Sequence, residues 1–408
     1  MLSAGLLLAA GALLLLAFTQ PLVERLPLTP ALIYLAIGVG AAAVFGTPHV
    51  ERLIEHAQPV RVALELALLV SLFVIGLRLR IAPTWRAWRT ALLLAGPGMV
   101  IFIAAGALAA VLAFDWGWGL AVVVAAVLAP TDPVLASDVQ VDSAKDRDAV
   151  RLSLTAEGAM NDGTALPGVI LGLWLLEPAS SPLGDPRAWV VDLLWPVAGG
   201  ALIGVALGWA LGCLIRARVR AGDALVRDEW LLAGGVTLAY GVALATHTSA
   251  FVLAFALAVV LLQPLRNDEA TPSERPIAER MQAFGLRLER LVEALAVIAI
   301  GVGVGLIVPS WSLLAFALAL LLIVRPLSVV ALVRSTAVTA HQRRLMAWFG
   351  IRGIGSLYYA ALALEHDLGV DAAAAMLSAV LAVLAASIVL HGVSVTPVMR
   401  RYRQRAPR

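Results

Sequence analysis

Three carboxylate side chains lie deep inside long apolar stretches of this sequence. Asp132 follows Pro130-Thr131, and Glu157 and Asp162 belong to a second stretch that also contains Asn161. A carboxylate that is removed from water needs a proton, a cation or a basic partner. These positions therefore indicate a buried site that handles protons or cations.

Arg325 and Arg352 are the cationic side chains inside apolar runs. An arginine at mid-membrane depth costs about 3 kcal/mol on insertion scales unless it is paired or faces water. We therefore expect acidic partners for both arginines, and the candidates are Asp132, Glu157 and Asp162.

Asp132, Asp162 and backbone oxygens near Thr131 form a donor set that suits a small alkali cation such as Na⁺. Glu157 and Asn161 are four residues apart and share one helical face, and Asp162 lies about 100° round from Asn161. Burial and a second carboxylate both favour the protonated form of an aspartic acid, so a proton and a cation would compete for this site. Because position 161 is an amide, only Asp162 of the adjacent pair can titrate, which favours electroneutral one-for-one exchange.

The elements that must hold these residues are membrane-spanning helices. Hydrophobic residues make up 61% of the 408 residues, charged residues make up 14%, and the mean hydropathy is +0.92, which is far more apolar than a soluble domain. The alternating pattern of a barrel strand is missing, so helices are the remaining way to cross a bilayer. Runs of about 20 apolar residues predict thirteen spans: 2–23, 26–46, 60–79, 90–114, 117–137, 151–176, 188–213, 229–246, 248–263, 291–308, 311–333, 345–364 and 373–397.

The distribution of basic residues predicts how the chain is oriented. The segments that follow the odd-numbered spans from the third onward carry 24 of the 30 Lys and Arg residues, and Arg25 follows the first span. Basic connections stay on the cytoplasmic side. We therefore expect a multi-pass protein of a bacterial inner membrane, with its N-terminus outside and its C-terminus in the cytoplasm.

The fifth and twelfth spans both contain helix breakers. Pro130 and Pro133 each lack a backbone donor, and Gly353 and Gly355 follow Gly350 within span 345–364. The predicted directions relate spans 4 to 6 to spans 11 to 13 by inversion, as in transporters that are built from inverted repeats with sites at broken helices.

Four motifs occur in order along the chain and resemble those of the NhaP-type branch of monovalent cation/proton antiporters, relatives of the eukaryotic sodium/proton exchangers. A weaker similarity lies at His247-Thr248-Ser249-Ala250-Phe251, and the resemblance covers essentially the whole chain. The four motifs are Thr131-Asp132-Pro133, Glu157 followed by Asn161-Asp162, Arg325-Pro326-Leu327, and Gly350-Ile351-Arg352-Gly353.

The resemblance implies an all-α, NhaA/NhaP-like antiporter fold with broken, crossing spans 5 and 12, in a homodimer. It implies an interface domain made of spans 1 to 3 (residues 1–89) and 7 to 10 (187–308). Spans 4 to 6 (90–186) and 11 to 13 (309–400) would form a mobile core, followed by a short cytoplasmic tail, 401–408.

The resemblance also implies roles for the site residues. Asp162 would bind the cation or the proton with Asp132 beside it, while Glu157 and Asn161 would engage Arg325. Arg352 matches a second family arginine that sets the local field or holds the core together. Some relatives have a serine after the glutamate where this chain has Gly158, so the choice between sodium and potassium stays open.

The expected activity is exchange of Na⁺, or Li⁺, for H⁺ by alternating access, with K⁺/H⁺ exchange as the alternative. An intramembrane aspartyl protease is a distant alternative, since the Gly-X-Gly-Asp element of presenilin-like enzymes is missing, and a passive channel is a third. The basic residues form no nucleic-acid-binding face. Apart from membrane lipid and a second protomer, no partner or cofactor is expected.

Three structural interpretations accompany these functional ones. The Glu157–Arg325 pair could simply hold two core helices together, and we favour that role for it. Glu65 is expected to be solvated near a membrane surface. Gly200, Gly204, Gly208 and Gly212 form a flat ribbon for close helix packing, either on span 229–246 of the same chain, which we favour, or on a second protomer.

Overall fold

A computed structural model describes most of the chain, and the residues it describes are helices and their connections. They are 10–11, 29–79, 81, 84–132, 135, 139–141, 146, 148–179, 181–221, 228–266, 274–334 and 338–405. The predicted first span, 2–23, lies outside the described residues apart from Ala10 and Gly11. The count of thirteen spans therefore stays a prediction.

The first half of the chain follows the predicted spans, with breaks that the apolar runs did not reveal. Span 90–114 is divided at Gly96-Pro97 and span 151–176 at Ala165, each directly before a helix with proline in its first turn. The helices are α2 (Pro30–Phe45), α3 (Val50–Glu55), α4 (Ala57–Arg78), α5 (Trp85–Ala95), α6 (Pro97–Phe114), α7 (Trp118–Val127), α8 (Ala149–Thr164), α9 (Leu166–Leu176) and α10 (Pro186–Ala188).

The second half contains one long interruption among its described residues that bears on the site. The chain leaves the helical conformation from Phe349 to Gly353, inside predicted span 345–364. The helices are α11 (Trp195–Arg220), α12 (Asp228–Thr246), α13 (Ala250–Leu261), α14 (Gln263–Arg266), α15 (Glu274–Gly303), α16 (Trp311–Ala319), α17 (Arg325–Val333), α18 (Ala340–Trp348), α19 (Ile354–Leu364) and α20 (Val370–Arg405).

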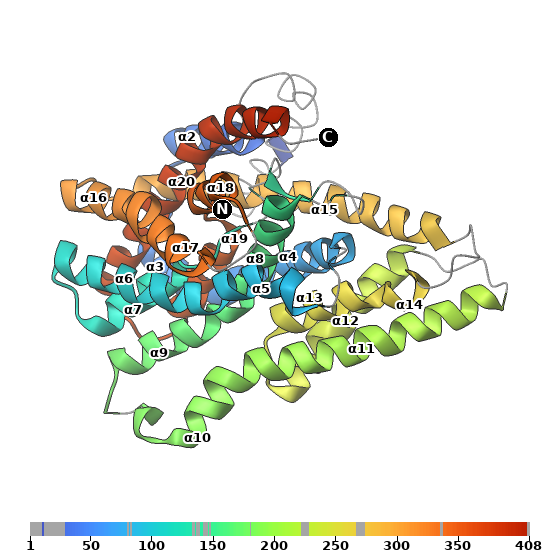
Figure 1. Ribbon diagram of the computed structural model, residues 1–408. Helices are drawn as coiled ribbons and strands as arrows, with labels where there is room; N and C mark the ends of the chain where they lie inside the picture. The colour runs from blue at the N-terminus through green and yellow to red at the C-terminus, as the bar shows by residue number, and fades with distance from the viewer. Residues whose placement is uncertain are drawn as a thin grey trace.

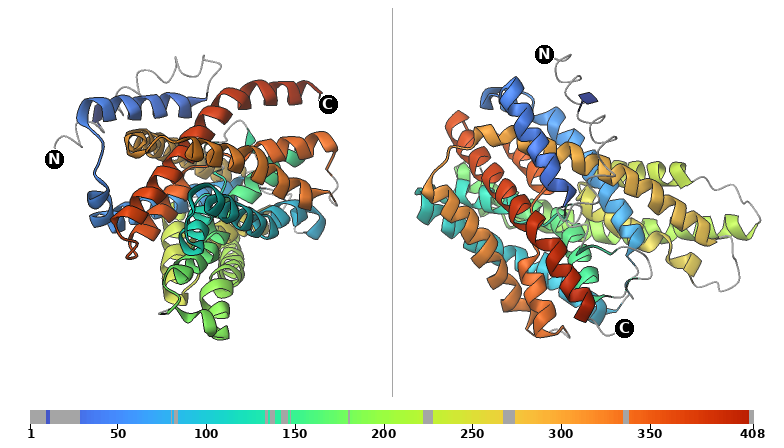
Figure 2. Two further views of the ribbon diagram at one scale, coloured as in Figure 1. Left: turned by 90° about the vertical axis from the view of Figure 1, so that its left-hand side faces the viewer. Right: turned by 90° about the horizontal axis from the view of Figure 1, so that it is seen from above.

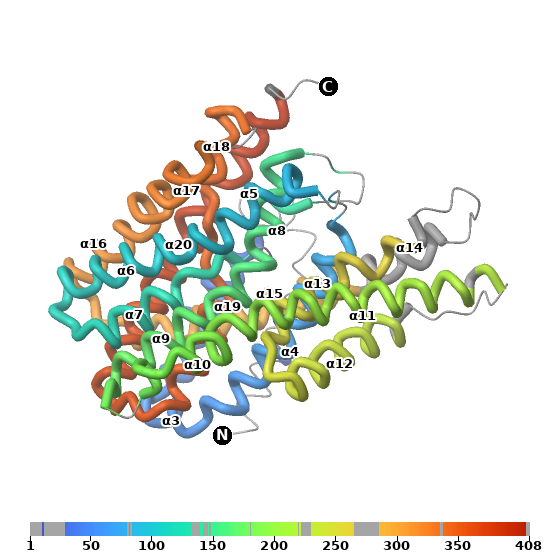
Figure 3. The backbone as a smooth tube through the Cα atoms, turned by 60° about the horizontal axis from the view of Figure 1, so that its bottom comes forward, coloured from blue at the N-terminus to red at the C-terminus, as the bar shows by residue number. Residues whose placement is uncertain are grey.

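The helices form two groups, with a third set of helices packed between them. In Figure 1, α11 to α14 lie on one side of the molecule and α6, α7, α16 and α17 on the other. Figure 3 shows α4, α8, α15 and α19 between these groups, where α4 packs on both α13 and α19. Figure 2 shows α2 alongside α20, and the backbone N–H of Thr29 donates to the carbonyl of Gly392 over 3.3 Å.

The chain is a multi-pass membrane protein. Within the described residues, six helical stretches are long and apolar enough to cross a bilayer. Five shorter apolar helices of 10 to 17 residues accompany them. The six stretches are Ala57–Arg78, Trp85–Phe114, Ala149–Leu176, Pro186–Arg218, Trp311–Val333 and Val370–Gln404.

Two wide helical turns each precede a proline. A π-helical turn at Trp189–Leu194 comes before Pro196, and another at Leu320–Val324 comes before Pro326. A proline ring crowds the carbonyl four residues earlier and cannot donate to it. The wide turn relieves that clash and lets the helix continue directly into Arg325.

The glycine ribbon packs within the chain, as we favoured, but its partner is α13 and not the predicted span 229–246. A Cβ atom added at any of the four positions would lie close to a backbone carbonyl of α13 or of Ser249, which directly precedes it. Since both rows advance by four residues, the two helices stay in close contact along their length. The glycines Gly200, Gly204, Gly208 and Gly212 face the carbonyls of Ser249, Leu253, Leu257 and Leu261.

Candidate functional site

Two non-helical segments meet where the site was predicted. Helix α7 ends at Val127, and the non-helical residues after it run to Asp132, whose backbone N–H donates to the carbonyl of Ile351 over 2.7 Å. Ile351 belongs to the interruption between α18 and α19. The carbonyl end of α7 and the N–H end of α19 are thereby brought together, so opposite partial charges lie at one place. Pro133 lies outside the described residues.

Arg352 neutralises the carbonyl end of this crossing. Its guanidinium donates to the carbonyls of Ala129 and of Pro130, the latter over 2.9 Å. The same group lies 4.3 Å from the ring centroid of Phe102, and the Arg352 side chain is 1% exposed. A cation is stabilised at a helix C-terminus and by an aromatic face. Arg352 thus has backbone carbonyls where an acidic partner was expected.

Asp132 occupies the opposite end of the crossing. Its Oδ2 accepts a hydrogen bond from the backbone N–H of Ile354 over 2.7 Å, at the first turn of α19. Gly353 makes this approach possible, because a Cβ atom there would overlap the Asp132 carboxylate. A carboxylate at a helix N-terminus is stabilised by the unpaired N–H groups.

Asp162 reaches the same turn of α19 from α8. Its side chain is buried, and a Cβ atom at Gly355 would overlap its carboxylate. The Oδ1 atom has no hydrogen-bond partner, although the hydroxyl of Tyr359 donates to the backbone carbonyl of the same residue. The charges of Asp162 and Asp132 act on each other. The structure therefore brings the two predicted carboxylates to neighbouring positions on one short segment.

Asn161 and Thr131 contact each other directly. The amide nitrogen of Asn161 donates to the hydroxyl of Thr131 over 2.7 Å, and Asn161 Oδ1 is buried without a partner. The resemblance implied that Asn161 engages Arg325, and this contact is not among those of the described residues. The reason is that α8 turns Asn161 toward the α7 side of the crossing, while Glu157, on the same helix, pairs with Arg325.

Glu157 and Arg325 form a buried, two-pronged ion pair. Arg325 Nη1 lies 2.5 Å from Glu157 Oε1, and Nη2 lies 2.9 Å from Oε2. Nη2 also donates to the carbonyl of Phe349 over 3.1 Å, so one arginine connects α8, α17 and the end of α18. Both oxygens of Glu157 are engaged, which favours the structural interpretation over ion ligation.

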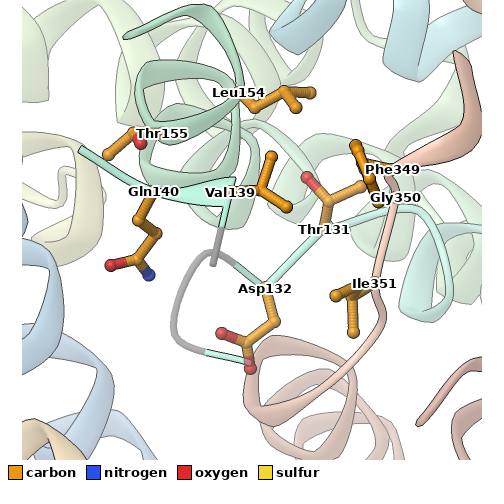
Figure 4. A pocket seen from close by; sticks show the side chains of 9 residues that line it. All are labelled: Thr131, Asp132, Val139, Gln140, Leu154, Thr155, Phe349, Gly350 and Ile351. Atoms are coloured by element: carbon orange, nitrogen blue, oxygen red, sulfur yellow. The ribbon is translucent and has the colours of Figure 1, made fainter. Parts of the chain in front are cut away.

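A cavity lies beside these residues, on the side of Thr131 and Asp132. Figure 4 shows the Phe349–Ile351 segment beside Thr131, and Gln140 and Thr155 across from them. Within the described ranges, no group of three or more His, Cys, Asp or Glu side chains is arranged to hold a metal ion. A small cation bound at the crossing would depend on Asp132, Asp162 and neighbouring neutral oxygens.

A second polar cluster lies close to the site and was missed in the sequence. Arg78 forms a buried ion pair with Glu289 and donates to Gln140 Oε1 over 3.3 Å. Glu293, one turn along α15, is 8% exposed, and its charge acts on that of Asp132. Arg78, at the end of predicted span 60–79, was counted with the cytoplasmic connection that follows it, and the tenth span was predicted to begin at residue 291. The four-residue spacing of the two glutamates was the available signal.

Glu65 is buried and paired, so the expectation that it is solvated is wrong. Arg61 lies 2.8 Å from Glu65 on the same helix and 2.6 Å from Glu365 at the end of α19. The hydroxyl of Tyr240 lies 3.5 Å from Glu65. The carboxylate faces α12 and α19 and not the membrane surface, which explains its burial.

The fold is that of known antiporters. A map of the sodium proton antiporter MjNhaP1 from Methanocaldococcus jannaschii superposes with a TM-score of 0.76 at 16% identity and covers 100% of both chains. A second structure of that protein, at pH 8, has a TM-score of 0.70 at 18% identity over 95% of this chain and 99% of that one. No curated protein sequence matches significantly.

The family is shown by the sequence itself. The profile described as "Sodium/hydrogen exchanger, transmembrane" matches residues 11–401, which includes every residue of the crossing. This excludes the intramembrane aspartyl protease alternative, because the family consists of transporters. The chain belongs to the sodium/hydrogen exchanger family and is a cation/proton antiporter, not an enzyme.

Proposed function

We propose that the protein exchanges Na⁺ or Li⁺ for H⁺, one for one, at a site formed by Asp162 and Asp132. Asp162 is the exchanging group, and Asp132 lies beside it as the second carboxylate. Thr131 and Asn161 contribute neutral oxygens at the edge of the site, and Glu157 acts through its pair with Arg325. Each species would occupy the site in turn, so that transport of one requires release of the other.

The observation that carries this proposal is the unpartnered Oδ1 of Asp162. The residue is 1% exposed, and the charge of Asp132 acts on it. A buried carboxylate oxygen without a donor is costly, and a second carboxylate nearby adds repulsion. A proton or a small cation relieves both costs, whereas an empty site relieves neither.

Alternating access is the proposed transport mechanism. Residues 90–186 and 309–400 would form the moving core, and 1–89 and 187–308 the interface domain of a homodimer. The crossing of the segments after α7 and α18 joins the two halves of the core through the Asp132–Ile351 backbone hydrogen bond. The arginine distribution supports a bacterial inner membrane with the N-terminus outside and the C-terminus in the cytoplasm.

Exchange in vesicles tests the proposal. Purified protein is reconstituted with a pH-sensitive dye inside, and separate pulses of Na⁺, Li⁺ and K⁺ are applied. We expect Na⁺ and Li⁺ to move protons in the wild type and Asp162→Asn to abolish the response. The exposed carboxylate variant Glu55→Gln serves as the control and keeps wild-type exchange.

Two outcomes of this assay would change the assignment. Undiminished exchange in Asp162→Asn overturns the proposed site, and a response to K⁺ alone establishes the potassium alternative. Electroneutrality is read in the same vesicles, since an imposed membrane potential leaves the rate of one-for-one exchange unchanged. Current steps in a planar bilayer would instead indicate a channel.

A further inference from the structure

Glu293 differs from the two other buried glutamates near the crossing in how it is partnered. Glu289 is paired with Arg78, and Glu157 is paired with Arg325. Glu293 accepts no hydrogen bond from a described residue, although more than nine-tenths of it is buried. An ionised carboxylate in that position is costly, so Glu293 is suited to exist with and without a proton.

The charges that act on Glu293 come from two different segments of the chain. Asp132 acts on it from the crossing, and Glu289 and Arg290 act on it from its own helix. Arg78, on α4, is directed to Glu289 and Gln140. The charge of Asp132 therefore acts on the carboxylate of Glu293, although no hydrogen bond joins the two side chains.

Gln140 is a polar residue of the cavity wall, and one of its hydrogen-bonding groups has no partner. It is 5% exposed, lines the cavity with Asp132, and has no partner for its Nε2. In Figure 4 the amide of Gln140 and the carboxylate of Asp132 are turned to the same side. A buried donor beside a cavity is a place where water can bridge two polar groups.

We propose that Glu293 is a proton relay between the Asp162–Asp132 pair and the membrane face that the arginine distribution assigns to the cytoplasm. The pair loses a proton when a cation binds, the carboxylate of Glu293 accepts that proton through water at Gln140, and Glu293 then releases it to solvent. The net charge of the region is conserved at the transfer step. This inference rests on the proposed function.

The relay is tested by comparing Glu293→Gln with Glu293→Asp in the vesicle exchange assay at a series of pH values. Positioned proton-transfer groups contribute about 100-fold to a rate, so we expect Glu293→Gln to lower the maximal exchange rate by about that factor. Its KM for Na⁺ should stay within about twofold of wild type, since the cation site is intact. Glu293→Asp should restore the rate and the wild-type pH profile.

Two further variants keep the test decisive. Gln140→Leu, on the opposite wall, should slow exchange as Glu293→Gln does, and it answers the question if Glu293→Gln fails to fold. Glu55→Gln is the matched control and leaves the pH profile unchanged.

The possible failures are distinguishable. If wild type exchanges and Asp162→Asn does not, while Glu293→Gln and Gln140→Leu both keep the wild-type rate and pH profile, the relay is wrong and the proposed function stands. If Asp162→Asn also exchanges normally, the proposed function itself has failed.

Discussion

Arg325 on α17 holds Glu157 on α8 through two parallel hydrogen bonds of 2.5 and 2.9 Å, and both side chains are almost completely buried. The same guanidinium donates to the carbonyls of Met346 and Phe349. Both oxygens of Glu157 and both terminal nitrogens of Arg325 therefore have protein partners. This arrangement predicts a contribution to stability that is separable from ion exchange.

Glu157→Gln should destabilise the protein strongly. Removing one partner of a buried pair leaves the other charge uncompensated and costs about 3–5 kcal/mol. Thermal unfolding of purified protein in detergent measures the loss. The double variant Glu157→Leu/Arg325→Leu, which removes both charges, should recover much of it. Wild-type stability with abolished exchange in Glu157→Gln would instead assign Glu157 to transport.

Gly353→Ala and Gly355→Ala should each impair exchange by displacing a carboxylate. A methyl group at position 353 overlaps Asp132, and one at position 355 overlaps Asp162. We expect the rate to fall by about 10-fold or more, since a displacement of about 1 Å in a reacting group can cost about 100-fold. Gly234→Ala, where the added atom meets open space, is the matched control. Normal exchange in both site variants would show that the carboxylates are not held against α19.

Gly208→Ala should separate α11 from α13. The added atom meets the backbone carbonyl of Leu257, and backbone cannot move aside as a flexible side chain can. Overpacking of this kind costs about 1–3 kcal/mol. Gly241→Ala, on α12 with nothing near the added atom, should be neutral or stabilising by up to about 1 kcal/mol. Unfolding temperatures of the two variants give the comparison, and equal values would contradict the close packing.

Arg352→Met should unfold at a lower temperature than Arg352→Lys. Methionine fills a similar volume but leaves the carbonyls of Ala129 and Pro130 without their donor, and each unsatisfied buried group costs about 1–3 kcal/mol. Lysine keeps the charge at the end of α7 and should recover part of the loss. Unfolding in detergent monitored by tryptophan fluorescence supplies the measurement. Identical curves for the two variants would argue against a capping role.

The membrane helices and the breaks in spans 5 and 12 were accessible to sequence reasoning because each depends on local composition, whereas the crossing of the two spans was implied by the family resemblance. A run of about 20 apolar residues predicts α4 and most of α20, and the glycines from 350 to 355 predict the interruption before α19. Asp132, Glu157 and Asp162 were identified because acids are rare in such runs.

The missed features depend on contacts between distant segments. Glu289 and Glu293 lie where α15 changes from polar to apolar, so they read as the edge of a span and not as part of its interior. The partner of Asn161 depends on the rotation of α8 against the segment after α7, which no spacing within one helix specifies. Arg78 reads as a solvated helix end until Glu289 is brought against it by the packing of α15 on α4.

Asp132 Oδ2 accepts the hydrogen bond from the N–H of Ile354, and the same oxygen is part of the proposed cation site. A species that displaces this oxygen leaves the first N–H of α19 without its acceptor, and losing such an acceptor costs about 1 kcal/mol. That amount corresponds to a roughly fivefold bias in an equilibrium. If the proposed cation binds Asp132, cation binding and proton binding would leave the start of α19 ordered to different degrees. Hydrogen exchange of the Ile354 amide would measure that difference.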